Sequence, residues 1–245
     1  MRSGQARYNC SMEQDEPIEY SLARLHASLL QSFDLGGLYS RNTVAHKWKA
    51  TFRSALLREA VFWRLEDLLQ QSYALHKMGH TLGALILLRS ALETLATLIY
   101  LNQLTAQVLD GSLNFHTFSA KTAQLLLGSR NAMTNHEAIN IKTVIQKCAK
   151  RYEFIETFYD DLSECAHPNH EGLIMGYSKP DLENYIHNFS NRWSSMYAKS
   201  HERKISLVVF MFQAEYNDVW TEQMKALEAW LVEHDAELEA TKDSG

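Results

Sequence analysis

The chain has 245 residues, 46% of them hydrophobic and 22% charged. This composition is ordinary for a globular protein, and the chain is long enough to bury a core without disulfides or a structural metal. A formal net charge of −5 argues against a strongly basic nucleic-acid-binding domain. Three cysteines without a C-x-x-C pair favour a reducing compartment. The first residues lack the apolar stretch of a secretory signal, and Arg89 and Glu93 interrupt the most apolar segment. We therefore expect a cytoplasmic protein with no membrane span and no cofactor.

The average charge hides local differences along the chain. Between Leu38 and Arg58 there are basic residues but no acidic one, and Gly111–His136 also contains no acid. From Glu215 onward the chain is strongly acidic. These differences leave room for a positive face on an acidic protein.

Residues 1–20 are polar, and we predict a loose tail there. Residues 21–240 are predicted to form one all-α domain. Apolar residues at helical spacing indicate a first helix over Leu22–Phe33, which Gly36 and Gly37 are expected to stop.

The middle of the chain predicts two long helices. Apolar residues at helical spacing run from 44 to 76, and Gly79 then marks a turn. The next segment, from Thr81 to about Leu104, is apolar almost all round, which is typical of a helix at the centre of a bundle. Asp110-Gly111 marks the following turn.

Shorter helices are expected in the second half. One ends at Gly128, and Thr134 with Glu137 has capping-box spacing, which predicts a helix starting near Asn135 and continuing to Cys148. A further helix is expected to end before Pro168, because proline disfavours helical geometry in the preceding residue.

The C-terminal part predicts two more helices. Pro180 sits at a favourable early-helix position before an apolar stripe over Leu182–Tyr197, and another helix covers Leu207–Leu231. No sustained alternation of apolar and polar residues predicts a sheet. The expected fold is a single all-α bundle of about seven or eight helices.

Arg89 and Glu93 lie four residues apart and therefore share one face of the most apolar helix. A structural ion pair that fixes helix packing is one interpretation, because a buried charge needs a partner. The alternative is that Arg89 faces a functional site and that Glu93 or Glu164 orients it.

Polar residues are densest between Tyr159 and Gly176. Ser163 and His167 are four residues apart and could form a hydrogen bond on one helix face. His167 and His170 could bind zinc together with a nearby glutamate, although the spacing matches no established motif. Alternatively, these side chains only satisfy backbone groups where a helix ends.

A second candidate site begins at Gly128. Arg130 and Asn131 precede His136 by a few residues, and an arginine that binds phosphate with a histidine that transfers protons would suit metal-independent RNA cleavage. The alternative is an ordinary loop and helix start capped by Thr134.

These segments resemble the HEPN superfamily. The resemblance rests on the turn at Gly79, the R-S-A-L-E helix (Arg89–Glu93) and the helix end S-E-C-A-H-P-N (Ser163–Asn169), and it covers about 55–177. It implies a small α-helical bundle, often a homodimer. Many such proteins are metal-independent ribonucleases of toxin–antitoxin, phage-defence or CRISPR systems, and others are non-catalytic RNA- or nucleotide-linked modules.

Catalytic HEPN families carry an arginine, commonly followed by a polar residue, with four to six residues between the arginine and a later histidine. Counting back from His167 gives Leu162, Asp161 or Asp160 instead of arginine. Arg130 to His136 meets the family spacing, with Asn131 as the polar neighbour.

Three functional hypotheses follow. The first is a bacterial defence or toxin-type ribonuclease, or a degenerate relative, which would act on RNA beside a cognate antitoxin or defence partner and would self-associate. The second is a non-enzymatic helical module that docks a protein or small ligand beside Glu164–His170, and the third is a metal-dependent hydrolase. The candidate catalytic residues are Arg89, Glu93, Arg130, His136, Glu164 and His167, and the candidate ligand contacts are Asn131, Ser163, Asn169, His170 and Tyr177.

Overall fold

The computed structural model describes residues 17–242. These residues form ten α-helices, two π-helical segments and one two-stranded hairpin, so the predicted all-α class is confirmed. The elements in chain order are α1 (Ile18–Ala27), α2 (Leu35–Arg41), α3 (Thr43–His46), α4 (Lys49–Lys77), α5 (Thr81–Leu109), α6 (Phe115–Leu127), α7 (Ile141–Cys148), α8 (Ile155–Ala166), η1 (His170–Met175), β1 (Ser178–Asp181), β2 (Ile186–Phe189), α9 (Trp193–Gln213), η2 (Ala214–Val219) and α10 (Trp220–Ala240).

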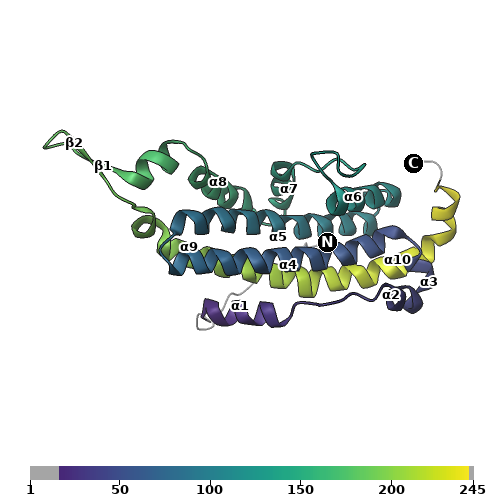
Figure 1. The fold of residues 1–245 in the computed structure, drawn as a ribbon. Helices are drawn as coiled ribbons and strands as arrows, with labels where there is room; N and C mark the ends of the chain where they lie inside the picture. The colour runs from purple at the N-terminus through teal and green to yellow at the C-terminus, as the bar shows by residue number, and fades with distance from the viewer. Residues whose placement is uncertain (1–16, 243–245) are drawn as a thin grey trace, which may run out of the picture.

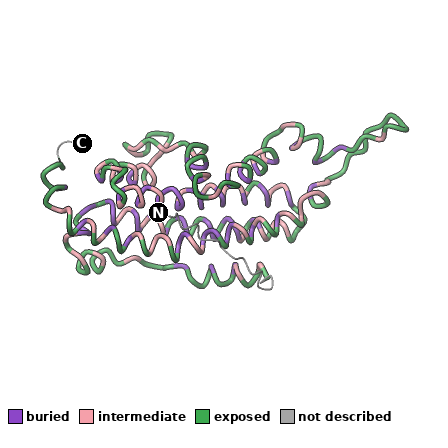
Figure 2. Tube along the Cα trace, turned by 180° about the vertical axis from the view of Figure 1, so that it is seen from behind, coloured by how far each residue is buried: buried purple, intermediate pink, exposed green. Residues whose placement is uncertain are grey.

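Helix α5 is the centre of the bundle. It packs against α4, against α9 and α10, and against the row formed by α6, α7 and α8 (Figure 1). Seventeen of its 29 residues are buried, which is the burial expected of a helix that is apolar all round. By length and hydropathy alone α5 could also cross a membrane, but the core helix of a bundle passes the same test. Figure 2 shows the buried residues concentrated along these long helices.

The two predicted turns that flank α5 are confirmed. Gly79 and Gly111 have φ angles of 80° and 77°, in the left-handed region that only glycine adopts without strain. Each glycine follows the end of a long helix, where a left-handed residue commonly closes the last turn. The turn at Gly79 sets α4 and α5 side by side, and the turn at Gly111 leads from α5 to α6.

The first helices depart from the prediction. Gly36 and Gly37 do not stop a helix but lie inside α2, because the Asp34 carboxylate accepts a hydrogen bond from the Gly37 N–H at 3.0 Å and caps it. The single helix expected over 44–76 is divided at Trp48 into α3 and α4. Most of the predicted tail, 1–16, lies outside the described residues, and residues 18–20 belong to α1.

No helix starts near Asn135. Residues 128–140 form a loop, in which the Thr134 hydroxyl bonds to the His136 carbonyl at 3.2 Å instead of capping a helix. Helix α7 begins only at Ile141, where the Asn140 side chain accepts from the Lys142 N–H at 2.9 Å. The capping-box spacing therefore gave a wrong helix start.

The helix predicted at Pro180 and the absence of a sheet are both wrong. Strand β1 pairs antiparallel with β2, and the resulting hairpin projects from one end of the bundle (Figures 1 and 2). The Asp181 carboxylate accepts from the N–H groups of Glu183 and Asn184, each at 3.1 Å, which stabilises a turn rather than a helix. Helix α9 starts only at Trp193.

Candidate anion-binding site

The residues predicted to act together lie in three separate places. Arg89 and Glu93 lie on α5, Arg130 and His136 on the α6–α7 loop, and His167 beyond the end of α8. In Figure 1 the α6–α7 loop and the C-terminal end of α8, which leads to the hairpin, lie on opposite sides of α7. Within residues 17–242, no hydrogen bond or ion pair joins the side chains of one of these groups to those of another.

Arg89 joins α5 to α8. Its guanidinium forms the expected ion pair with Glu93 at 3.3 Å and donates a hydrogen bond to the Tyr159 hydroxyl at 2.8 Å. The guanidinium also lies over the Tyr159 ring, 5.1 Å from the centroid, where a cation–π attraction adds to the contact. This arrangement matches the interpretation of Arg89 as a residue that fixes helix packing.

The polar side chains at the end of α8 bind one another or the backbone. The Ser163 hydroxyl donates to the Tyr159 carbonyl at 2.8 Å instead of bonding to the His167 side chain, and Ser163 meets His167 through its carbonyl, which accepts from the His167 N–H at 3.2 Å. The Asn169 side chain donates to Glu164 and accepts from the Gly172 N–H at 2.9 Å. His167 has the extended backbone that Pro168 demands.

The next turn, η1, closes the same loop. Glu171 accepts hydrogen bonds from the Tyr197 hydroxyl and from the Cys165 thiol. Burial, followed by the nearby Glu171 carboxylate, raises the pKa of Cys165 to about 12, which suppresses its nucleophilic thiolate form. Tyr177 packs edge-on against Trp193 at 6.2 Å between ring centroids. These contacts are those of a folded connection.

His167 and His170 are exposed, and neither side chain forms a hydrogen bond or ion pair in the described part of the chain. Within residues 17–242, no group of three or more His, Cys, Asp or Glu side chains is placed to hold a metal ion. The described residues therefore give no support to the zinc-site hypothesis.

The α6–α7 loop leaves its arginine in solvent. Arg130 and Asn131 are exposed, and His136 is half-buried with its carbonyl accepting from the Ser129 N–H at 2.9 Å. Asn131 accepts only a long hydrogen bond, 3.4 Å, from the Met133 N–H. No contact joins Arg130 to His136 among the described residues, so the catalytic pair stays a prediction.

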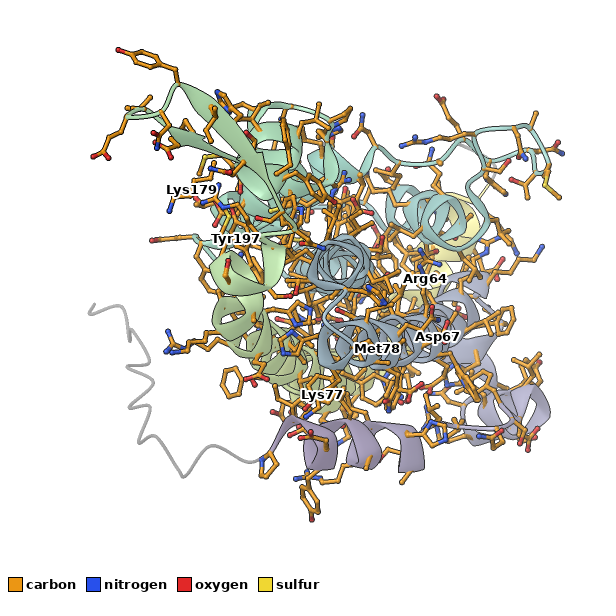
Figure 3. The ribbon with its side chains drawn as sticks, turned by 60° about the vertical axis from the view of Figure 1, so that its left-hand side comes forward. Arg64, Asp67, Lys77, Met78, Lys179 and Tyr197 are labelled. Carbon is orange, nitrogen blue, oxygen red and sulfur yellow. The ribbon has the colours of Figure 1, made fainter. Side chains whose placement is uncertain are left out.

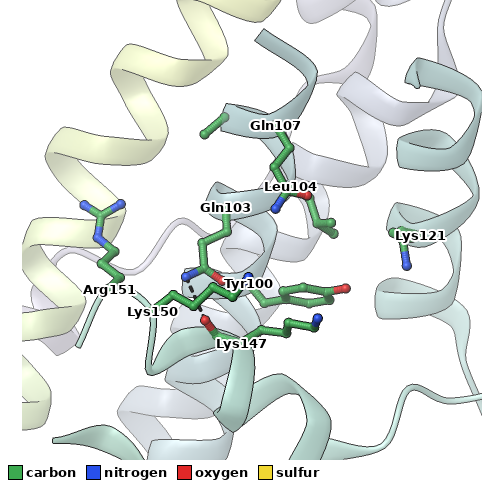
Figure 4. Close-up of a pocket in the computed structure, with 9 residues that line it drawn as sticks. Tyr100, Gln103, Leu104, Gln107, Lys121, Lys147, Lys150 and Arg151 are labelled. Atoms are coloured by element: carbon green, nitrogen blue, oxygen red, sulfur yellow. Dashed lines mark hydrogen bonds between the residues drawn. The ribbon is translucent and has the colours of Figure 1, made fainter. Parts of the chain in front are cut away.

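A basic pocket lies between α5, α6 and the end of α7, and sequence reasoning did not identify it. Its volume is about 490 Å³, within the range typical of small-ligand sites. Four lining residues are cationic, and no acidic residue lines the pocket (Figure 4). The polar wall consists of Tyr100, Gln103 and Gln107 from α5, Lys121 from α6, and Lys147, Lys150 and Arg151 from the end of α7 and the turn after it.

The lysines of this pocket have no acidic partners. Lys121, Lys147 and Lys150 form no ion pair within residues 17–242. In Figure 4, Lys147 and the Tyr100 hydroxyl extend toward Lys121 on the opposite wall. Lysine at the last turn of a helix is often there only to balance the helix dipole, and Lys147 fits that explanation. Lys121 does not, because it lies in the middle of α6.

Two contacts hold the α7 side of the basic pocket. The Gln103 amide donates to the Lys147 carbonyl at 3.1 Å and ties the end of α7 to α5. Arg151 pairs with the fully buried Glu215 at 2.8 Å. The pocket wall is therefore fixed by the bundle rather than by a loose loop.

Glu215 is the centre of a buried polar network behind the pocket. Besides Arg151, its carboxylate accepts from the Tyr152 hydroxyl at 2.7 Å and from the Asn102 amide at 2.8 Å. Several donors are what a buried carboxylate needs to offset desolvation. The same burial, followed by the Glu215 carboxylate, raises the pKa of Cys148 to about 12.

The chain matches no protein-family model, and no characterised protein or solved structure is significantly similar to it. Function must therefore be argued from geometry. The excess of basic over acidic residues in a longer stretch of the sequence could have indicated the basic pocket. Gly111–Tyr152 contains six lysine and arginine residues and a single acid, Glu137.

Proposed function

We propose that the protein binds RNA, and that the basic pocket holds phosphates of the RNA backbone. The observation that supports this is the convergence of Lys121, Lys147, Lys150 and Arg151 on one pocket that no acidic residue lines. The three lysines form no ion pair within residues 17–242, so they are available to replace the counterions of a polyanion, which is the main source of sequence-independent affinity. The resemblance to HEPN proteins, some of which are RNA-linked modules, agrees with this proposal.

Backbone recognition fits these side chains better than base recognition does. Lysine is a flexible point charge that tolerates varied phosphate geometry. Tyr100 is buried, so it offers little ring face for a base to stack on. The amides of Gln103 and Gln107 line the same pocket and provide hydrogen-bonding groups of the kind that read a ribose 2′-hydroxyl.

The proposed activity is binding without cleavage. Metal-independent cleavage needs a general acid or base beside the phosphate, usually histidine. None of the residues lining the basic pocket is a histidine. We therefore assign no chemical step to this site.

Fluorescence anisotropy with a labelled single-stranded RNA tests the proposal. The Lys121→Ala/Lys147→Ala/Lys150→Ala variant should bind at least about tenfold more weakly than wild type at low salt, because three phosphate contacts are removed. The matched control removes three exposed lysines elsewhere, Lys49, Lys199 and Lys225, and should retain most of the affinity. Absence of binding by wild type, or equal losses in both triple variants, would refute the proposal.

A gel assay in EDTA addresses cleavage separately. We expect wild type to leave the RNA intact. Cleavage that disappears in His136→Ala would restore the Arg130–His136 hypothesis, and cleavage that disappears in His167→Ala would point to the end of α8 instead.

A further inference from the structure

The hairpin formed by β1 and β2 is an exposed apolar arm. Leu182, Tyr185, Ile186 and Phe189 are 81%, 94%, 50% and 78% exposed, respectively. Scattered single apolar residues are normal on a surface, but a contiguous group of this kind marks an interaction site. The arm lies outside residues 55–177, the part that resembles HEPN proteins.

Within residues 17–242, the arm is held at its base. The Arg192 guanidinium donates to the carbonyls of Met175 and Ser178 at 3.0 and 2.7 Å, and the Ser190 N–H donates to the Tyr177 carbonyl at 3.0 Å. Beyond its own pairing, the hairpin has substantial contact only with η1 among the described elements. In Figure 3 the hairpin, which carries Lys179, stands away from the helices.

An isolated two-stranded hairpin is at best marginally stable in water, and a third strand or a helix normally completes it. The two edges of this hairpin are not equivalent. Pro180 has no N–H and is tolerated where the missing donor faces outward, so the outer edge of β1 is a poor template for another strand. The outer edge of β2, Ile186–Phe189, contains no proline and remains open.

We propose that two copies of the chain associate through β2, side by side and antiparallel, to form a four-stranded sheet across a two-fold axis. A two-fold interface uses the same surface on both copies, so a strand that pairs with itself satisfies the symmetry without any other surface. With the two-fold axis at Asn188, antiparallel pairing sets Phe189 of one copy opposite His187 of the other on the same face of the sheet, with the two Phe189 rings as diagonal neighbours, and such aromatic cross-strand pairs stabilise a sheet.

Charge and area favour a second copy over other partners. The arm carries one lysine, Lys179, and two acids, Asp181 and Glu183, but all three lie on β1 or in the turn, so no Lys, Arg, Asp or Glu on β2 opposes the pairing of two β2 edges. The acids beside the tip disfavour insertion into an anionic lipid surface. Buried aromatic side chains each contribute about 150–250 Å², so four exposed apolar residues supply several hundred Å² per copy. That area is of the same order as the roughly 800 Å² per partner of a standard interface.

Sedimentation equilibrium of the full chain, without RNA, tests this inference. We expect a dimer that dissociates on dilution, and Phe189→Glu should raise the dimer dissociation constant at least tenfold. Phe210→Glu is the matched control, because Phe210 is also an exposed phenylalanine but lies on α9. The dimer dissociation constant of the Phe210→Glu variant should stay at the wild-type value.

Ile186→Lys provides a second variant on the same edge, and circular dichroism checks that every variant is folded. A monomeric wild type at all concentrations would overturn the inference. So would a dimer that Phe189→Glu and Ile186→Lys leave intact, or one that Phe210→Glu weakens equally. Because no RNA is present, the result is independent of the proposed RNA binding.

Discussion

Two polar regions of this molecule differ in how their side chains are used. At the end of α8, Glu164 and Asn169 bind each other, and Glu171 accepts from Tyr197. In the basic pocket, Lys121, Lys147 and Lys150 face open space without an acidic partner. A dense polar sequence thus marks a closed loop, whereas the more dispersed cations mark the candidate site. What distinguishes a site here is unpaired charge rather than polar density.

The largest loss of stability is expected when the buried Glu215 carboxylate behind the basic pocket is removed. Glu215→Ala leaves the donors of Tyr152 and Asn102 buried without an acceptor, so the free energy of unfolding should fall by about 3 kcal/mol or more. Urea denaturation measures this change. The control Glu233→Ala alters an exposed glutamate of α10 and should stay within about 0.5 kcal/mol of wild type. Similar stabilities for the two variants would mean that the network does not support the pocket wall.

Thiol reactivity tests whether the α8 loop is closed. Because burial raises the pKa of Cys165 to about 12, its thiolate fraction at pH 8 should be on the order of a thousandfold below that of a free cysteine. Iodoacetamide should therefore modify Cys165 at least about a hundredfold more slowly in the native protein than in urea. Peptide mass spectrometry gives both rates. Equal rates would show an open loop and would revive the cysteine as a candidate nucleophile.

The smallest change in stability is expected in the α8 loop, where a variant can test whether the loop takes part in RNA binding. Asn169→Ala removes the acceptor for the Gly172 N–H and should lower the free energy of unfolding by about 1 kcal/mol, as the loss of a cap does. RNA affinity should not change, because Asn169 is remote from the basic pocket. Asn217→Ala is the control, since its side chain is exposed and its loss should affect neither property. Weaker RNA binding by Asn169→Ala would make the α8 loop part of the site.

The sequence predicted the centre of the fold better than its ends. The all-round apolar pattern of α5 and the glycines at 79 and 111 determined the central helices, because burial and left-handed turns leave strong local signals. The hairpin was missed because the Asp181 turn and the pairing of β1 with β2 override an apolar stripe at helical spacing. The helix expected near Asn135 failed because Thr134 bonds within the loop.

The candidate site was harder to predict than the fold. Lys121 and Lys147 are 26 positions apart, and only the packing of α6 and α7 on α5 brings them to one pocket. The absence of acids in Gly111–His136 indicated a positive face, but the pocket also needs residues up to Arg151. Local motifs such as the H-P-N-H run drew attention to residues whose main role is to close a loop.

The salt dependence of RNA binding tests the central claim most directly. For single strands, the logarithm of the binding constant should fall with the logarithm of salt concentration with a slope of about −0.7 for each phosphate neutralised. Wild type should therefore show a slope of roughly −2 to −3 if three or four cations contact phosphates. The variant lacking Lys121, Lys147 and Lys150 should have a slope shallower by about 2, with the control trio close to wild type. A slope that the pocket variant leaves unchanged would contradict the account.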